Sequence, residues 1–251
     1  MKNVCFLSLL LCANFALAQT DAALTNTMRD EINNGYLEIS PYRIINGVAQ
    51  APGKVTGDVY LNPEWQMADV WFYPEVVARV DPKASDKVSK IPVRLDLSNQ
   101  YLEFNLPEGV KAIEAGSIKK IEFKDLAGLH TFLNVKQYGL RNNDMQGFVE
   151  VLSDGKIKVV KYTRLFLKQA TYNVALNVGE RDAKLIKQSE YYTVEGKNAP
   201  VLVKFKPTNN ALKKLMKSKA KKVESFMEAE QLNPKRDEDL IRILAYYNEL
   251  S

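Results

Sequence analysis

Residues 147–168 read GFVEVLSDGKIKVVKYTRLFLK, and this stretch predicts a β-hairpin at the centre of the fold. Two apolar segments, 147–152 and 156–168, flank Ser153-Asp154-Gly155. An Asp-Gly pair between two apolar runs is typical of a tight type I′ turn, in which the glycine takes a positive φ. The second segment carries apolar residues at both odd and even positions, so both of its faces are partly apolar. Such a strand belongs in a sheet that is covered on both faces along part of its length.

Other strand-like segments lie on both sides of this hairpin. They are short, rich in Val, Ile, Tyr and Phe, and separated by turn signals, which is typical of an all-β region. The segments are 43–48, 54–61, 68–73, 76–80, 91–97, 100–106, 110–115, 117–123 and 131–138, and a second hairpin pairs 191–194 with 201–205. The sequence therefore predicts a mainly β body, built as an antiparallel sandwich or as a curved half-barrel sheet.

The pattern changes from strand-like to helix-like after residue 206. Pro207 and Thr208 form a helix start signal, Asn233-Pro234 interrupts the apolar pattern, and a last helix begins with acidic residues. We expect two or three short amphipathic helices between residues 208 and 248. Their apolar faces should pack on the sheet through Leu212, Leu215, Leu240 and Leu244. The predicted class is therefore α+β, with a β-rich body over 19–206 and a lysine-rich helical tail over 207–251.

The first eighteen residues are typical of a secretory signal peptide. Lys2 supplies the positive charge, residues 4–15 are mostly apolar, and Ala16-Leu17-Ala18 is the small-x-small pattern that precedes a cleavage site. We therefore expect an exported chain that begins at Gln19. The apolar run is shorter than the roughly 20 residues that a retained membrane anchor needs.

Both cysteines of the chain lie in this segment. A lipid anchor on Cys12 would need a small residue before it, and the chain has Leu11 there. Cleavage would remove Cys5 and Cys12 together, so the exported chain would contain no thiol. Exported proteins without cysteine are more typical of a bacterial periplasm or cell surface than of a eukaryotic secretory route.

Positive charge is concentrated in the tail. The whole chain has a formal net charge of +5, and residues 204–222 alone contain eight lysines. Such lysines commonly form the solvated face of an amphipathic helix. The functional alternative is docking onto an anionic envelope component, such as lipid headgroups or lipopolysaccharide, or onto an acidic protein. The lysines that would make this contact are Lys213, Lys214, Lys217, Lys219, Lys221 and Lys222. We expect no nucleic-acid partner, because export removes it.

Motifs for catalysis and metal binding are scarce. His130 is the single histidine, and we interpret it as a strand-end residue without a role. The sequence contains no glycine-rich phosphate loop and no Gly-x-Ser-x-Gly elbow. Asn142, Asp144 and Gln146 are spaced as in a calcium loop, but the twelfth position is Ser153 instead of a bidentate glutamate. We therefore expect no metal and no cofactor.

One aromatic stretch offers two other functions. Trp65, Trp71 and Tyr73 could line a site for an apolar ligand inside a curved sheet, as in a carrier or a sensor. Acidic residues lie between and beside them, so a carboxylate-dependent glycan hydrolase is a further alternative. On the commoner interpretation, these are core aromatic residues beside loop carboxylates.

The order of the C-terminal features resembles a group of uncharacterised exported proteins that are common in Bacteroidota. The features are the hairpin from Gly147 to Lys156, the strand with Tyr191-Tyr192, and a lysine-rich helical end that closes on Tyr246-Tyr247-Asn248. The resemblance covers about the last hundred residues and implies a Gram-negative envelope location, without an activity or a site. The leading expectation is a non-catalytic envelope protein that acts through binding or structural interactions.

Overall fold

The computed structural model describes residues 54–80, 83, 85–124, 128–139, 145–196 and 198–250. The predicted signal peptide, the strand predicted at 43–48 and the calcium-like residues Asn142 and Asp144 lie outside these residues. The chain forms two compact units. The described part of the first, here called the hairpin unit, is 54–58 with 167–185. The second, the main unit, comprises the described residues from 59 to 166 and from 186 onward.

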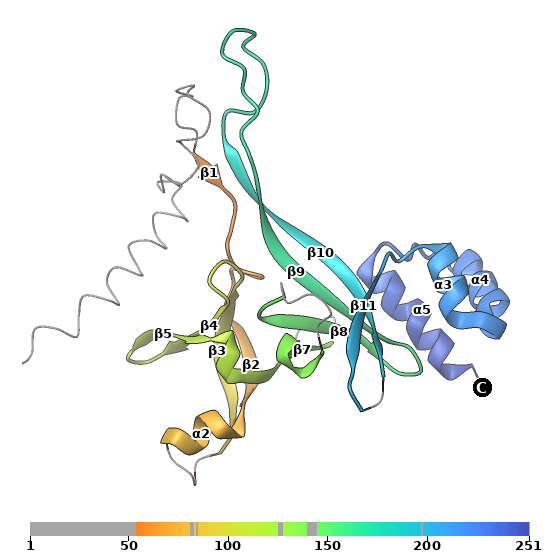
Figure 1. The fold of residues 1–251 in the computed structure, drawn as a ribbon, viewed down its shortest axis with the longest axis horizontal. Helices are drawn as coiled ribbons and strands as arrows, with labels where there is room; N and C mark the ends of the chain where they lie inside the picture. Colours follow the sequence, from red (N-terminus) through yellow and green to blue (C-terminus); the bar gives the residue numbers. More distant parts are fainter. Residues whose placement is uncertain are drawn as a thin grey trace, which may run out of the picture. The chain divides into compact units, whose positions relative to one another are not determined.

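Strands are the commonest element of the described chain, and three helices follow them at its C-terminal end (Figure 1). This arrangement confirms the predicted class, mainly β with a C-terminal helical segment. The strands are β1 (Val55–Thr56), β2 (Gln66–Phe72), β3 (Lys87–Asp96), β4 (Tyr101–Leu106), β5 (Gly109–Glu114), β6 (Ile118–Lys124), β7 (Leu129–Asn134), β8 (Phe148–Asp154), β9 (Lys158–Lys168), β10 (Ala183–Glu195) and β11 (Val201–Phe205). The helices are α2 (Pro74–Val80), α3 (Asn209–Met216), α4 (Ala220–Ala229) and α5 (Asp237–Glu249), with 3₁₀ turns η2 (Ala115–Ser117), η3 (Val135–Gln137) and η4 (Lys217–Lys219).

The strands of the main unit form one open sheet. Its order is β10-β9-β8-β7-β6-β2-β3-β4-β5, with β11 paired to the end of β10. Both predicted hairpins are present: β8 and β9 are antiparallel with Val149 opposite Tyr162, and β10 and β11 are antiparallel with Tyr191 opposite Phe205. Within the hairpin unit, β1 pairs in parallel with the first residues of β10.

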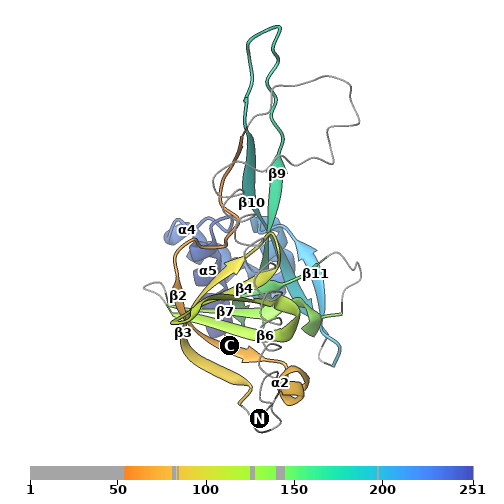
Figure 2. The same cartoon turned by 90° about the vertical axis from the view of Figure 1, so that its left-hand side faces the viewer.

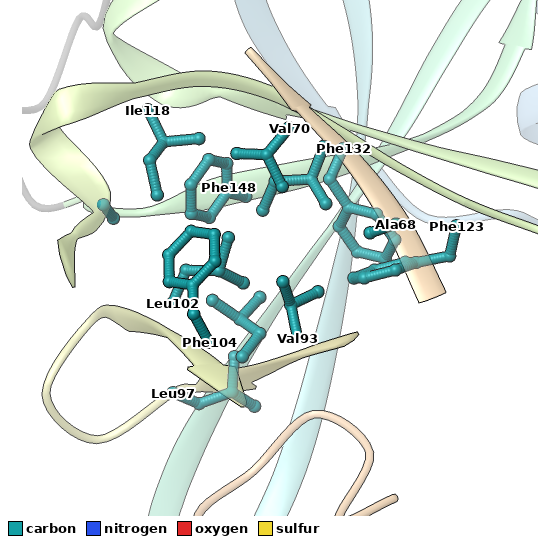
Figure 3. Packing of buried hydrophobic residues seen from close by; sticks show 13 residues of the cluster. Ala68, Val70, Val93, Leu97, Leu102, Phe104, Ile118, Phe123, Phe132 and Phe148 are labelled. Carbon is teal, nitrogen blue, oxygen red and sulfur yellow. The ribbon is translucent and has the colours of Figure 1, made fainter. Parts of the chain in front are cut away.

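The sheet curves, so that one of its faces encloses an apolar core (Figure 3). The core side chains come from strands at both ends of the curve: Val93, Leu102 and Phe104 from β3 and β4, and Ile118, Phe132 and Phe148 from β6, β7 and β8. All of them are at most 7% exposed. The interior of the curved sheet is therefore filled with side chains, four of them phenylalanines when Phe123 is included.

The helical tail covers one face of β8 and β9. Leu240, Ile243 and Leu244 of α5 are fully buried against a cluster that includes Leu152 of β8 and Val159 of β9. Figure 2 shows α4 and α5 from another side. Of the leucines predicted to pack on the sheet, Leu212, Leu240 and Leu244 belong to this cluster, while Leu215 is half-buried and Met216 takes its place.

The opposite face of β9 is covered as well. Val160 and Tyr162 pack in a third cluster with Val149 of β8 and Tyr192 of β10. The neighbouring residue Val159 points into the helical cluster on the other side. Both faces of β9 are therefore buried along part of its length, as its apolar pattern predicts.

Two local predictions were wrong. Residues 76–80 belong to helix α2, which starts at Pro74 and carries Glu75 in its first turn and Arg79 in its last. Proline suits the first helical position because its missing N–H is unbonded there in any case, and the two charges complement the helix dipole. These start and stop signals outweigh the strand preference of the valines.

The second correction concerns Gly155, which is not among the residues with a positive φ. The turn between β8 and β9 contains Gly155, Lys156 and Ile157, so it is not a two-residue type I′ turn. A Cβ at Gly155 would instead lie 2.1 Å from Nδ2 of Asn248. Close approach of the α5 side chain explains why this position needs glycine.

Candidate functional site

The helices that cover the sheet present a basic surface. α3 begins after Thr208, whose hydroxyl accepts a hydrogen bond from the N–H of Ala211 at 3.3 Å. Leu212 and Met216 of α3 and Val223 of α4 are at most 2% exposed and anchor both helices in the core. Because the apolar faces are buried, the polar residues of the helices lie on the outside.

The structure separates the six predicted lysines into two sets. Lys213 forms an ion pair with Glu224 between α3 and α4, and Lys219 is half-buried and interacts with another residue. The other four are exposed, and within the described part of the chain they have no carboxylate partner: Lys214, Lys217, Lys221 and Lys222. We call these four residues the basic surface. They come from α3, η4 and α4, which follow one another without a gap.

A small pocket lies between the same two helices. Its volume is about 250 Å³, and its apolar wall includes Leu212, Met216, Val223 and Met227. Lys213 lines it too, together with three polar residues of α4 and its end, Glu224, Glu228 and Gln231. The charge around this pocket is mixed, so the pocket does not extend the basic surface.

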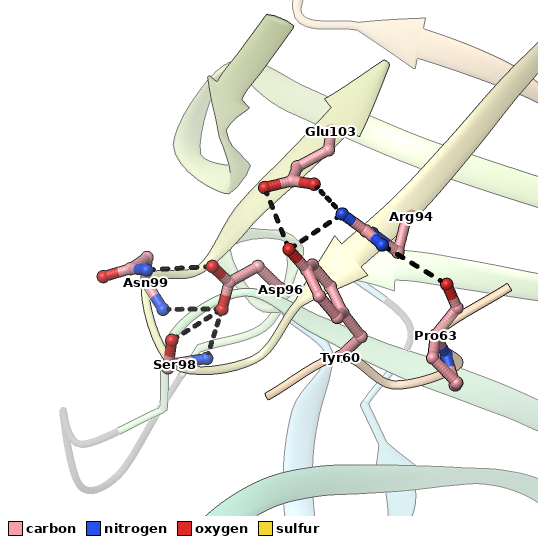
Figure 4. Close-up of polar contacts among 7 residues, drawn as sticks. All are labelled: Tyr60, Pro63, Arg94, Asp96, Ser98, Asn99 and Glu103. Carbon is pink, nitrogen blue, oxygen red and sulfur yellow. Dashed lines mark hydrogen bonds and ion pairs between the residues drawn. The ribbon is translucent and has the colours of Figure 1, made fainter. Parts of the chain in front are cut away.

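Trp65 lies against a group of charged and polar side chains that we call the Arg94 cluster. Figure 4 shows its members Arg94, Glu103 and Tyr60. The guanidinium of Arg94 lies 4.5 Å from the ring centre of Trp65 and 3.6 Å from that of Tyr60. Its Nη2 donates to Oε2 of Glu103 at 2.8 Å and to the hydroxyl of Tyr60 at 2.9 Å. The Glu103 side chain is 0% exposed, so Arg94 supplies the charge that makes its burial tolerable.

A second buried acid in the same view shapes the turn between β3 and β4 (Figure 4). Asp96 accepts hydrogen bonds from the backbone N–H and the hydroxyl of Ser98 and from the backbone N–H and the amide of Asn99. Four donors satisfy both carboxylate oxygens. The Asp96 carboxylate is therefore fully hydrogen-bonded within the turn, and its role is structural.

Trp71 and Tyr73 have separate surroundings. The ring of Trp71 lies 3.7 Å from Nζ of Lys120 and 4.5 Å from Nζ of Lys87, which belong to the two strands that flank β2. Burial and the nearby charge of Glu75 raise the pKa of Tyr73. None of the three predicted aromatic residues belongs to the core of the curved sheet. Their role as ligand contacts stays a prediction.

The single histidine belongs to a chain of polar side chains that we call the Lys161 cluster. Nδ1 of His130 lies 2.9 Å from Oε1 of Glu150, and Oε2 of Glu150 lies 2.5 Å from Nζ of Lys161. Lys161 also donates to Oδ2 of Asp237 at 2.8 Å, and the hydroxyl of Tyr191 donates to Oδ1 of Asp237 at 2.7 Å. Because Asp237 is the first residue of α5, the cluster connects the helical tail to four strands.

Electrostatics holds the Lys161 cluster together. Burial alone would lower the pKa of Lys161, but the charges and hydrogen bonds of Glu150 and Asp237 outweigh it and raise this pKa. Burial and the hydrogen bond to Asp237 also raise the pKa of Tyr191. Both groups therefore keep their protons at neutral pH. The ammonium of Lys161 fills the space between the two carboxylates, where a glycosidase would have to place its substrate.

A second pocket, of about 380 Å³, lies where β3, β5 and β7 end. Its polar wall is largely occupied with structural bonds. The amide of Asn134 donates to the carbonyls of Ala115 and Ile118, and Nζ of Lys136 donates to the carbonyl of Gly116. The pocket therefore offers few free polar groups to orient a ligand.

No set of three or more His, Cys, Asp and Glu residues in the described ranges is arranged to hold a metal ion. None of the helices in this part of the chain has the length and apolarity needed to span a membrane. Comparison with protein-family models, curated proteins and solved structures finds no match. The function of this chain is therefore inferred from the positions and contacts of its own residues.

Two groups of residues were missed by sequence reasoning. The Lys161 cluster joins residues up to 107 positions apart, from His130 to Asp237, and no short motif connects them. The tip of the β9–β10 hairpin did leave a signal, since residues 169–179 contain no charged residue although charged residues make up 26% of the chain. A charge-free run between two strands of a lysine-rich protein is the pattern that could have identified it.

Proposed function

We propose that this chain is an exported, non-catalytic protein of the bacterial envelope that binds an anionic lipid surface through the basic surface of α3, η4 and α4. The observation that carries the proposal is a set of four exposed lysines that have no carboxylate partner among the described residues, Lys214, Lys217, Lys221 and Lys222. Glu224 neutralises Lys213, whereas no carboxylate of the described residues neutralises the other four lysines, so their charge is available to an anionic partner.

The helices hold this charge in place. α3 and α4 are packed through residues that are almost fully buried, and the ion pair of Lys213 with Glu224 joins them. A fixed platform loses little entropy when it binds a surface. Each lysine near an anionic membrane contributes about 1 kcal/mol, so four together supply a useful affinity without any pocket.

The predicted signal peptide supports the location. An export signal would bring the mature chain to the periplasm or to the outer surface, where anionic lipids and lipopolysaccharide are the abundant anionic partners. Intact mass of the protein recovered from the producing bacterium tests this step. We expect a mature chain that begins at Gln19, and a lipid-modified N-terminus at Cys12 would contradict the proposal.

The binding step is tested with vesicles. Wild-type mature protein should sediment with vesicles that contain phosphatidylglycerol, and the bound fraction should fall steeply as salt rises, because the Debye length shrinks to about 10 Å at 0.1 M. The four substitutions Lys214→Gln, Lys217→Gln, Lys221→Gln and Lys222→Gln should together weaken this binding by at least tenfold while the melting temperature stays unchanged.

A matched control removes the same charge elsewhere. Lys111, Lys119, Lys124 and Lys235 are also exposed, and their replacement by Gln lowers the net charge by the same amount. This control should keep most of the binding. Equal losses in both variants would show that net charge alone attracts the protein, and a wild-type protein that ignores anionic vesicles at low salt would refute the proposal.

The structure gives the two alternative functions less support. An apolar carrier needs an interior cavity, and phenylalanine side chains occupy the interior of the curved sheet. The glycan-hydrolase alternative depends on Glu64, Asp69 and Glu75 beside the aromatic stretch, and Asp69 is already paired with Lys87 at 2.6 Å and bonded by the N–H of Lys90 at 3.0 Å.

A further inference from the structure

The exposed apolar side chains of the described residues are concentrated in one hairpin. Ten large apolar side chains are exposed, and five of them fall within residues 166–186, which hold the end of β9, the connection and the start of β10. Val174 and Leu176 are the two most exposed, at 68% each, and Val178 is 55% exposed. These three residues belong to the hairpin unit and are here called the apolar tip.

Several polar groups around the apolar tip form hydrogen bonds within residues 172–178. The N–H of Asn173 donates to the carbonyl of Val178 at 2.8 Å, and the N–H of Leu176 donates to Oδ1 of Asn173 at 3.1 Å. Oδ1 of Asn177 accepts from the hydroxyl of Tyr172 at 2.6 Å. The two asparagines thus turn their oxygens inward, and the aliphatic side chains are left on the outside.

The base of the tip is tied in the same way. The N–H of Thr171 donates to the carbonyl of Glu180 at 2.9 Å, and the N–H of Glu180 returns a bond to the hydroxyl of Thr171 at 3.1 Å. Gly179, with a φ of 100°, lies where a Cβ would be 2.4 Å from the carbonyl oxygen of Thr171. This glycine lets the two strands approach closely enough for the bonds to form.

Charged residues and a tyrosine lie at the base of the apolar tip. Residues 169–179 carry no charge, and Lys168, Glu180 and Arg181 lie just outside them, with Lys168 paired to Glu180 at 3.2 Å. The guanidinium of Arg181 is 4.5 Å from the ring centre of Tyr172 and donates to its hydroxyl at 2.9 Å. Tyrosine with a basic residue beside it is the composition that proteins place at the boundary between lipid and water.

We propose that the apolar tip inserts into a lipid bilayer, with Val174, Leu176 and Val178 among the acyl chains and Tyr172 with Arg181 at the headgroups. A bilayer interior offers no water to satisfy polar groups, so the hydrogen bonds that Asn173, Leu176 and Tyr172 make inside the tip lower the cost of inserting it. Protein interfaces are enriched in aromatic residues, Met and Arg, whereas the three exposed apolar side chains of the tip are all aliphatic. The inference goes beyond the proposed function, because it concerns another element and requires no anionic lipid.

The experiment uses the absence of thiols in the mature chain. Leu176→Cys in protein that begins at Gln19 gives a single cysteine, which is labelled with the environment-sensitive fluorophore NBD. On addition of uncharged phosphatidylcholine vesicles, we expect the emission to rise and shift to the blue, and lipids brominated on their acyl chains should quench it. NBD at Gln188→Cys, an exposed position in β10, should not respond.

Binding without a label provides the second measurement. Val174→Asp with Leu176→Asp should reduce flotation with phosphatidylcholine vesicles at least tenfold, because a charge in the hydrocarbon region is expensive. The matched control, Met67→Asp with Val110→Asp, changes two other exposed apolar residues and should bind as the wild type does. Melting curves of all variants exclude loss of fold as the cause.

The outcomes separate this inference from the proposed function. An unresponsive NBD group at position 176 refutes tip insertion even if lysine-dependent binding to anionic vesicles persists. Equal responses at positions 176 and 188, or equal losses in the tip and control variants, also refute it and would point to nonspecific adsorption. If insertion into uncharged vesicles persists after replacement of the four lysines, the apolar tip binds lipid independently of the basic surface.

Discussion

The Arg94 cluster and the Lys161 cluster each join a cation, at least one carboxylate and a tyrosine hydroxyl, but they differ in burial. The first holds the segment around Tyr60 against β3 and β4, and the second holds α5 against β8 and β9. Glu103 is 0% exposed and depends on the charge of Arg94. The Lys161 side chain is 15% exposed, and Lys161 and Tyr191 can lose protons. Solution conditions should therefore weaken the attachment of the helical tail before they weaken the curved sheet.

The largest expected effect comes from the curved sheet. Arg94→Met leaves the carboxylate of Glu103 buried without a cation and should lower the free energy of unfolding by roughly 3–5 kcal/mol. Urea denaturation measures the change. Combining it with Glu103→Leu should restore most of the loss, since no charge then remains buried. A single variant as stable as the wild type would mean that Glu103 reaches water.

Lys161→Met breaks the Lys161 cluster and should lower the free energy of unfolding by less, roughly 1–3 kcal/mol. The loss is smaller because the side chains of Glu150 and Asp237 are 11% and 34% exposed to water. The control in the same strand is Lys158→Met, whose partner Asp154 is 70% exposed. We expect the control to change stability by less than about 0.5 kcal/mol. If both variants lose the same stability, the Lys161 cluster does not anchor α5.

The far end of α5 gives a third test. Gly155→Val should displace Asn248, which accepts from the N–H of Lys156 at 2.9 Å and donates to the hydroxyl of Ser153 at 3.3 Å. Two hydrogen bonds predict a loss of about 1–2 kcal/mol. In an Asn248→Ala background the same substitution should cost much less, because the two changes remove one contact. An unchanged cost in that background would favour backbone strain at Gly155 instead.

The smallest expected effect concerns Tyr191 of the Lys161 cluster and is measured as a function of pH. Tyr191→Phe removes one hydrogen bond to Asp237 and should cost about 1 kcal/mol at pH 7. The pKa values of Lys161 and Tyr191 are raised from ordinary values of 10.5 and 10.0, so their contributions are complete below about pH 10 and are lost as pH rises further.

The readout is the slope of unfolding free energy between pH 9 and 12. Wild type should lose stability above about pH 10, and Tyr191→Phe should lose less with each pH unit. Identical slopes in wild type and Tyr191→Phe would show that the titration of Tyr191 does not contribute to the pH dependence of stability.

Much of the strand order could be predicted from local pattern, and the errors have local causes. β11 matches its predicted range, and β8 and β9 match to within two residues because the apolar runs are long and bounded by turn residues. At α2 the valines favoured a strand, while Pro74 and Glu75 carried the stronger helix signal. At Gly155 the requirement for glycine comes from Asn248, 93 positions later, which no turn rule can include.

The candidate site was predicted only as a region. The sequence placed the six lysines on amphipathic helices, but it could not tell which of them would find partners. Lys213 and Glu224 are eleven residues apart on two helices, and only the packing of α3 against α4 brings them together. Spacing rules within one helix extend to three or four residues, so they cannot identify such a pair.

Strand β8 also sets an order of events during folding. Phe148, Val149 and Leu152 belong to the core of the curved sheet, the cluster shared with Tyr192 and the helical cluster, respectively. The β8–β9 hairpin closes a short loop, so its entropic cost is low, and once formed it presents an apolar surface to every later partner. We therefore expect substitutions in this hairpin to slow refolding, and substitutions in α5 mainly to accelerate unfolding.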